Sequence, residues 1–227
     1  MMKSYSFTFS LVIISIIILI SPVISNTGFG KCQVKTPSVV QNFQLNRYLG
    51  KWFEQFRDKN TPFQKGDCVI AEYTLFEDKY SKNELKIRVT NSELELNESK
   101  KELNYLNNNN ENDERKQRRV AHGRAFSSDP SVGKLLVTFA PEYLDNFDFI
   151  KGPYWVLDTD YENFTFVYSC KEILGLYYSE FFWVLTREKR PNEETLQQYL
   201  KTIQEKYGYS ADKFRSRTVQ GDDVCFN

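Results

Sequence analysis

The feature that most limits the fold of this chain is a series of short apolar or alternating runs separated by polar turns. The runs are rich in valine, tyrosine, phenylalanine and threonine, which favour strands. Outside one polar stretch, the spacing between runs is too short for the crossovers that parallel strands need, so we predict an antiparallel meander. The runs cover residues 53–57, 68–76, 84–96, 118–126, 134–139, 154–157, 164–168 and 181–186.

Eight such runs predict a closed barrel. Eight is the number of strands at which an antiparallel barrel has room for packed side chains or for one small ligand. We therefore predict an all-β, eight-stranded antiparallel up-and-down barrel. Near the C-terminus, apolar residues from Leu196 to Tyr207 recur at helical spacing, after a start near Asn192 and before a stop at Gly208. This pattern predicts one α-helix packed on the outside of the barrel.

The first 25 residues have the layout of a secretory signal peptide. Lys3 precedes an apolar run, and Val23 and Ser25 occupy the small-residue positions before a cut. The apolar stretch approaches the length of a membrane span, so an uncleaved anchor is the alternative, against which Pro22 argues. We expect residues 1–25 to be a signal peptide, residues 26–227 to form a single domain, and the protein to be secreted.

The cysteines and the charge balance narrow the function classes. Cys32, Cys68, Cys170 and Cys225 are an even number in a chain addressed to an oxidising compartment, which predicts two disulfides with three pairings open. Their separations are unlike those of a structural zinc site, so we expect no metal. The formal net charge is zero, which gives no electrostatic reason to expect a nucleic-acid partner.

Residues 97–119 are polar and predict a solvated inserted loop, although the sequence does not tell which end of the barrel carries it. Glycosylation sequons occur at Asn97 and Asn163. In a secreted protein either one can carry a glycan. Asn97 borders the polar stretch and is the better candidate, whereas Asn163 is expected in a tight turn.

Three segments, in this order, resemble the signature segments of the lipocalin family. They are NFQLNRYLGKWFE at residues 42–54, VLDTDYENF at residues 156–164, and Arg187 after FFWVLT. The shorter segments GKC, PYW, TDYEN and VYSC resemble the apolipoprotein D-like lipocalins in particular. The resemblance implies an eight-stranded barrel with a 3₁₀ turn at its closed end and a C-terminal helix on its flank.

The resemblance also implies structural roles for several residues. Gly50 turns the chain into the first strand, Trp52 plugs the closed end of the barrel, and the Arg187 guanidinium lies over the indole. We expect none of these three to be catalytic. The other implied structural residues are the turn Thr159, Asp160 and Tyr161 and the disulfide pairs Cys32–Cys170 and Cys68–Cys225.

A barrel strand points alternate side chains inward, so one anchored residue per strand orients the others. Because Arg187 is expected to point inward, Trp183 and Phe181, at alternating positions before it, are expected to point inward too. The resemblance places Tyr73 and Tyr154 in the cavity. The lining is mostly apolar, which suits a lipid, fatty acid, retinoid or steroid, with Asn91 and the tyrosine hydroxyls available to orient a polar head. The candidate ligand-binding residues are Tyr73, Val89, Asn91, Val137, Phe139, Tyr154, Val156, Val167, Phe181 and Trp183.

Several alternatives compete with a carrier of a small hydrophobic ligand. A bilin pigment fits the same type of cavity, and a filled barrel can serve as a secreted partner-binding or stress-protective protein. We predict no enzymatic activity and no cofactor, because the sequence has a single histidine, His122, and no hydrolase, metalloprotease or P-loop motif. Haem ligation by His122 is a weaker alternative, because a lone histidine on a strand commonly has no such role.

We expect the protein to be a monomer. Residues 147–150, with the sequence FDFI, are a candidate apolar segment at the rim of the barrel. Such a segment favours association with a lipoprotein or a membrane surface.

Overall fold

The structure is a computed structural model that describes residues 27–32, 34, 37–75, 85–96, 116–214, 217–221 and 225. The expected signal peptide, the sequon at Asn97 and residues 97–115 of the polar stretch lie outside the described residues. Within the described part of the chain, no helix is long and apolar enough to cross a membrane.

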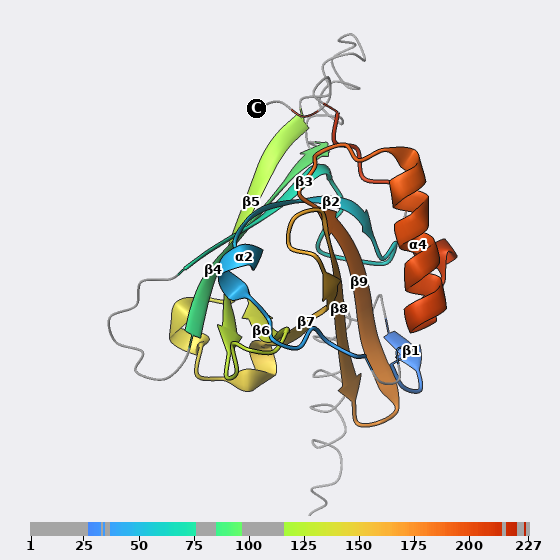
Figure 1. The fold of residues 1–227 in the computed structure, drawn as a ribbon. Helices are drawn as coiled ribbons and strands as arrows, with labels where there is room; N and C mark the ends of the chain where they lie inside the picture. Colours follow the sequence, from blue (N-terminus) through green and yellow to red (C-terminus); the bar gives the residue numbers. More distant parts are fainter. Residues whose placement is uncertain are drawn as a thin grey trace, which may run out of the picture.

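The described residues contain nine antiparallel strands in one sheet, eight of which close into the predicted up-and-down barrel (Figure 1). Strand β9 pairs with β2 on one side and with β8 on the other, and this double pairing closes the barrel. The strands are β1 (Thr27–Phe29), β2 (Gly50–Arg57), β3 (Asp67–Leu75), β4 (Leu85–Leu96), β5 (Lys116–Ser127), β6 (Lys134–Thr138), β7 (Gly152–Thr159), β8 (Phe164–Ile173) and β9 (Tyr177–Thr186).

Several strands differ from the sequence prediction; β8 and β9, for example, are longer than the predicted runs. Strand β1 was not predicted; it has three residues and pairs with the start of β9 outside the barrel closure. Strand β5 begins at Lys116, so residues 116–119 belong to a strand and not to the predicted loop. Cross-strand pairing explains this extension, because Arg119 donates to Glu95 Oε1 at 2.7 Å on the neighbouring β4.

The helical elements are short, with one exception. The 3₁₀ turn expected before the first barrel strand is α2 (Leu45–Tyr48), in which the carbonyl of Gln44 accepts both an i+3 and an i+4 hydrogen bond. Three 3₁₀ turns follow later, η2 (Glu142–Leu144), η3 (Asp148–Ile150) and η4 (Ala211–Lys213).

The C-terminal helix α4 (Glu193–Tyr207) packs on the outer face of the barrel beside β9, as predicted (Figure 1). Asn192 caps its N-terminus by accepting a hydrogen bond from Thr195 N at 2.8 Å, and Gly208 ends it with φ +67°. Its buried face joins Phe166 and Phe182 of the barrel in an apolar cluster outside the cavity.

Both disulfides implied by the resemblance are present. Cys32–Cys170 ties the segment before the barrel to β8, and Cys68–Cys225 ties the C-terminal segment to β3. Two disulfides suit a protein of an oxidising, extracellular compartment.

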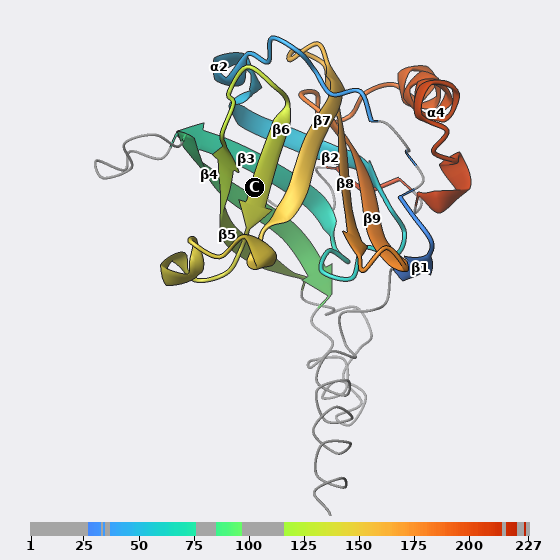
Figure 2. The same cartoon turned by 90° about the horizontal axis from the view of Figure 1, so that it is seen from below.

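The two ends of the barrel differ. Figure 2 shows α2 at one end, with η2, η3 and the β8–β9 hairpin at the opposite end. In the β4–β5 ladder, Leu85 pairs with Ser127 near α2, and Leu96 pairs with Lys116 at the far end. The end of β4 and the start of β5 therefore lie at the end of the barrel opposite α2.

Candidate functional site

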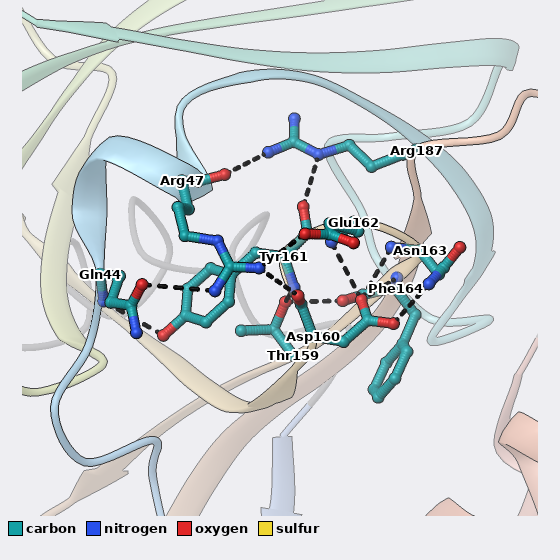
Figure 3. Close-up of polar contacts among 9 residues, drawn as sticks. All are labelled: Gln44, Arg47, Thr159, Asp160, Tyr161, Glu162, Asn163, Phe164 and Arg187. Carbon is teal, nitrogen blue, oxygen red and sulfur yellow. Dashed lines mark hydrogen bonds and ion pairs between the residues drawn. The ribbon is translucent and has the colours of Figure 1, made fainter.

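Arg187 and Trp52 close the barrel at the α2 end. The Arg187 guanidinium lies 3.7 Å from the centre of the Trp52 ring, and the fully buried Trp52 donates from Nε1 to Tyr48 O at 2.9 Å. Gly50 has φ +93°, the left-handed backbone that the turn into β2 requires. Arg187 also donates to the backbone carbonyls of Arg47 and Tyr161 (Figure 3). It donates in addition to the carbonyls of Tyr48, Leu49 and Lys51.

The turn at residues 159–164 supports this closed end. Asp160 Oδ1 accepts from the backbone N–H groups of Asn163 at 2.7 Å and Phe164 at 3.1 Å (Figure 3). Although burial opposes the shift, hydrogen bonds led by those from Asn163 lower the pKa of Asp160. The Asn163 side chain donates to Asp160 Oδ2 at 2.7 Å, so the amide of this sequon is held inside the turn.

Inside the barrel, beyond this closed end, lies a cavity of about 250 Å³ that opens at the far end. Phe63 and Phe139 stand at its mouth, where each side chain is both exposed and part of the lining. The lining includes nine of the ten predicted ligand-binding residues, namely Tyr73, Val89, Asn91, Val137, Phe139, Tyr154, Val167, Phe181 and Trp183.

The tenth predicted residue, Val156, is not part of the lining. Its side chain points inward, as alternation along β7 requires, but it is fully buried in the cluster that contains Tyr48 and Trp52. Its backbone also bonds to Val40 and Gly133 at the closed end. Val156 therefore lies below the cavity, which is shorter than the strands that surround it, and its contact with a ligand stays a prediction.

Several lining residues were missed by the sequence prediction. Val69 and Ala71 alternate with Tyr73 along β3, so extending the alternation used for the other strands would have found them. The β2–β3 loop contributes Phe63 and Gln64, for which no periodic pattern exists. The remaining missed residues are Glu54, Gly152 and Pro153.

Three tyrosines form a chain of hydroxyl groups at the inner end of the cavity. Tyr154 lies between the other two, with its hydroxyl oxygen 2.8 Å from that of Tyr48 and 2.7 Å from that of Tyr73. Burial raises the pKa of Tyr48 to about 12, and it raises the pKa values of Tyr73 and Tyr154 well above the ordinary value. These groups therefore stay neutral at physiological pH.

The mouth of the cavity is partly covered by the β2–β3 loop. The Phe63 ring lies 5.4 Å from the Phe181 ring, centre to centre, in an edge-on contact. Trp183 donates from Nε1 to Gln64 Oε1 at 3.0 Å. These contacts place Trp183 between the lining of the cavity and the loop.

Other groups weighed in the sequence lie away from the cavity. His122 is exposed on β5, with its Nδ1 3.4 Å from Thr90 Oγ1. All four cysteines are in disulfides. In the described residues, no group of histidine, cysteine, aspartate and glutamate has the arrangement of a metal site.

Comparisons with known proteins agree with this geometry. A family model described as a lipocalin-like domain matches residues 43–219. Apolipoprotein D of Mus musculus is 34% identical over 188 residues, covering 83% of this chain and 82% of that protein. The Lazarillo protein of Schistocerca americana is 26% identical over 70% of this chain and 63% of its own length. The solved structure of insecticyanin from the tobacco hornworm Manduca sexta matches with a TM-score of 0.59 and 19% identity, covering 88% of this chain and 92% of that chain, which supports the fold alone.

Proposed function

The chain belongs to the lipocalin family, and we propose that it binds and transports a small hydrophobic molecule inside its barrel. The observation that carries this proposal is the cavity of about 250 Å³, open at one end and lined mainly by aliphatic and aromatic side chains. Such a lining gains free energy from the burial of apolar ligand surface. The tyrosine hydroxyls and Asn91 provide polar contacts that can orient the ligand.

The size of the cavity favours a slim ligand. Ligand pockets commonly measure about 300–1,000 Å³, so this cavity lies just below the lower limit. A fatty acid or other single-chain lipid, a retinoid or a steroid suits it better than the broad tetrapyrrole of a bilin. An open cavity also argues against a filled barrel that works only through its surface.

Tryptophan fluorescence tests the proposal. Of the three tryptophans, Trp183 lines the cavity, Trp52 lies under Arg187, and Trp155 packs against Tyr168. The oxidised protein is titrated with retinoic acid, arachidonic acid, a steroid and biliverdin. We expect saturable quenching by a slim ligand, lost in Trp183→Phe and retained in Trp155→Phe.

Two results would redirect the proposal. Saturable quenching by biliverdin alone would support the pigment-binding alternative. No response to any compound, in protein whose near-ultraviolet circular dichroism shows a folded barrel, would support a filled barrel that acts through its surface.

We further propose that the protein is secreted after removal of residues 1–25, and that residues 26–227 form one domain that works as a monomer without enzymatic activity. The disulfides support secretion, and the absence of a free cysteine argues against thiol chemistry in the cavity. N-terminal sequencing of the secreted protein tests the cleavage. Light scattering measures the oligomeric state and tests whether the protein is a monomer. Titration of free thiols tests the proposed lack of enzymatic activity, because a reactive thiol in the native protein would contradict it.

The rim of the cavity supports a proposed contact with lipid surfaces. Phe149 and Leu174 are 74% and 90% exposed, on the two turns that flank the mouth. Lys171, near the end of β8, donates from Nζ to Phe149 O at 3.0 Å and so connects this strand to η3. Exposed apolar side chains that gather at one place mark an interaction surface. We define the rim patch as Phe139, Tyr143, Phe147, Phe149, Leu174 and Leu176.

Co-sedimentation with neutral phosphatidylcholine vesicles tests the rim patch. We expect the protein to bind such vesicles and the double variant Phe149→Ser/Leu174→Ser to lose most of this binding. Ligand binding in solution should survive, because neither side chain lines the cavity. Equal vesicle binding by both proteins would show that the rim patch does not contact lipid.

A further inference from the structure

Glu54 is a charged residue in the wall of a mainly apolar cavity. It lies on β2, lines the cavity and is 1% exposed. Its Oε1 forms an ion pair with Arg57 and accepts a hydrogen bond from Thr218 Oγ1 at 2.8 Å. Arg57 also donates from Nη2 to the carbonyl oxygen of Gly66 at 2.9 Å. Oε1 of the carboxylate is therefore engaged by two donors of the protein.

The other oxygen, Glu54 Oε2, is buried and has no hydrogen-bond partner among the described residues. Asn91 Oδ1, on β4, is buried in the same way, and Asn91 also lines the cavity. A buried acceptor without a donor is costly, and solvent in the free protein can relieve this cost. A ligand that displaces this solvent must supply a donor itself or leave the acceptor without a partner.

The charge of the lining sets a second limit on the ligand. Glu54 is the only charged residue in the lining of the cavity, as far as the described residues extend. The nearest cation, Arg57, is already engaged by Glu54 and by Gly66. Among the described lining residues, a carboxylate head buried here would have no cation to pair with, and it would be repelled by Glu54.

We propose that Glu54 selects ligands whose buried polar head is a neutral hydrogen-bond donor, a hydroxyl or an amide N–H, over ligands with a carboxylate or a carbonyl head. This inference rests on the proposed function, because it names the class of molecule that the same cavity takes. Glu54 Oε2 accepts the donor of the ligand, and the outer contacts with Arg57 and Thr218 hold the carboxylate in place.

A series of ligands with one skeleton and different heads tests the inference on the unaltered protein. The affinities of all-trans-retinol, retinal and retinoic acid are measured by quenching of Trp183. We expect retinol to bind about tenfold to a hundredfold more tightly than the other two, the factor that one hydrogen bond to a charged acceptor contributes. Equal affinities would overturn the inference and leave the carrier function standing. Failure of every retinoid and of arachidonic acid to bind the folded protein would count against the carrier function itself.

Two variants then assign the selectivity to Glu54. In Glu54→Gln, the amide oxygen can keep the contacts with Arg57 and Thr218 while the amide nitrogen replaces Oε2. We expect the preference for retinol over retinal to be lost or reversed. The matched control Glu72→Gln changes a glutamate on β3 that is not part of the cavity lining, and it should keep the preference. An unchanged preference in folded Glu54→Gln would overturn the inference. If this variant does not fold, the ligand series on the unaltered protein decides alone.

Discussion

At the level of single residues, Arg187 combines a contact with the Trp52 ring at 3.7 Å and hydrogen bonds to several backbone carbonyls near α2. Its truncation would leave these carbonyls without their donor and would uncover the indole. Arg47 offers a comparison on the same end of the barrel, because it also lies over an aromatic ring, that of Tyr161 at 4.7 Å. Its ion pair with Glu162 is solvent-exposed.

We therefore expect Arg187→Ala to lower the free energy of unfolding by about 3 kcal/mol, the combined loss of a cation–π contact and of hydrogen bonds to partly buried carbonyls. Arg47→Ala should cost less than about 1 kcal/mol, as exposed ion pairs do. Urea unfolding of the oxidised proteins measures both. Similar losses in the two variants would contradict a special role for Arg187.

Residue alternation predicted most of the cavity lining but could not give its depth. Val156 points inward as predicted, yet it lies below the cavity, because the aromatic cluster at the closed end occupies part of the barrel. The depth depends on how large side chains from different strands stack, which a one-dimensional pattern does not contain. Glu54 was missed although it follows Trp52 by two positions on β2, because a buried charge is not expected from composition. Phe63 and Gln64 reach the cavity from a loop.

At the level of elements, the β8–β9 hairpin combines backbone strain with exposure. Leu174 at its tip has φ +54° and is followed by Gly175 with φ +67°. A leucine in the left-handed region costs stability, and this one is almost fully exposed. Its exposure agrees with the contact proposed above between the rim patch and a lipid surface.

We expect Leu174→Asn to raise the free energy of unfolding by up to about 1 kcal/mol, because asparagine tolerates positive φ better than leucine. Leu176→Asn is the matched control, since Leu176 is exposed on the same turn but is not among the residues with positive φ. Thermal unfolding measures both variants. A gain of equal size in the control would show that reduced exposure, and not backbone strain, is the cause.

The barrel strands and α4 could be predicted from sequence because both depend on local periodicity. The eight alternating runs correspond to β2–β9, and the cap residues Asn192 and Gly208 border α4. Strand β1 could not be predicted, because three residues contain no period and pair only through tertiary contact with β9. The start of β5 was obscured by its charges, which pair across the strands with β4.

At the level of the whole molecule, the chain of Tyr48, Tyr154 and Tyr73 links the closed end to the cavity. Burial raises the pKa of Tyr48 to about 12 from an ordinary value of 10.0, and it raises the pKa values of the other two well above 10.0. The folded protein therefore holds these protons more tightly than the unfolded chain. The stability from this difference is complete below pH 10 and is lost as the pH rises through 10 towards 12 and above.

We expect the free energy of unfolding to fall steeply above about pH 10, the ordinary pKa of tyrosine. Tyrosinate absorbance should show that the buried hydroxyls ionise only as the protein unfolds. Tyr154→Phe should make the fall less steep, and Tyr143→Phe, at an exposed position, should leave it unchanged. Ionisation of every tyrosine near pH 10 in the folded protein would contradict the buried hydroxyl chain.

The central claim is that a small hydrophobic molecule binds inside the barrel, and a variant that fills the cavity tests it most directly. Val137 lines the cavity on β6, and its neighbour Leu136 is exposed. The measurement is the affinity of the ligand identified by fluorescence for Val137→Phe and for Leu136→Phe, both shown to be folded. The account predicts at least about a tenfold loss of affinity for Val137→Phe and no loss for Leu136→Phe. Unchanged binding in both variants would place the ligand outside the barrel and contradict the account.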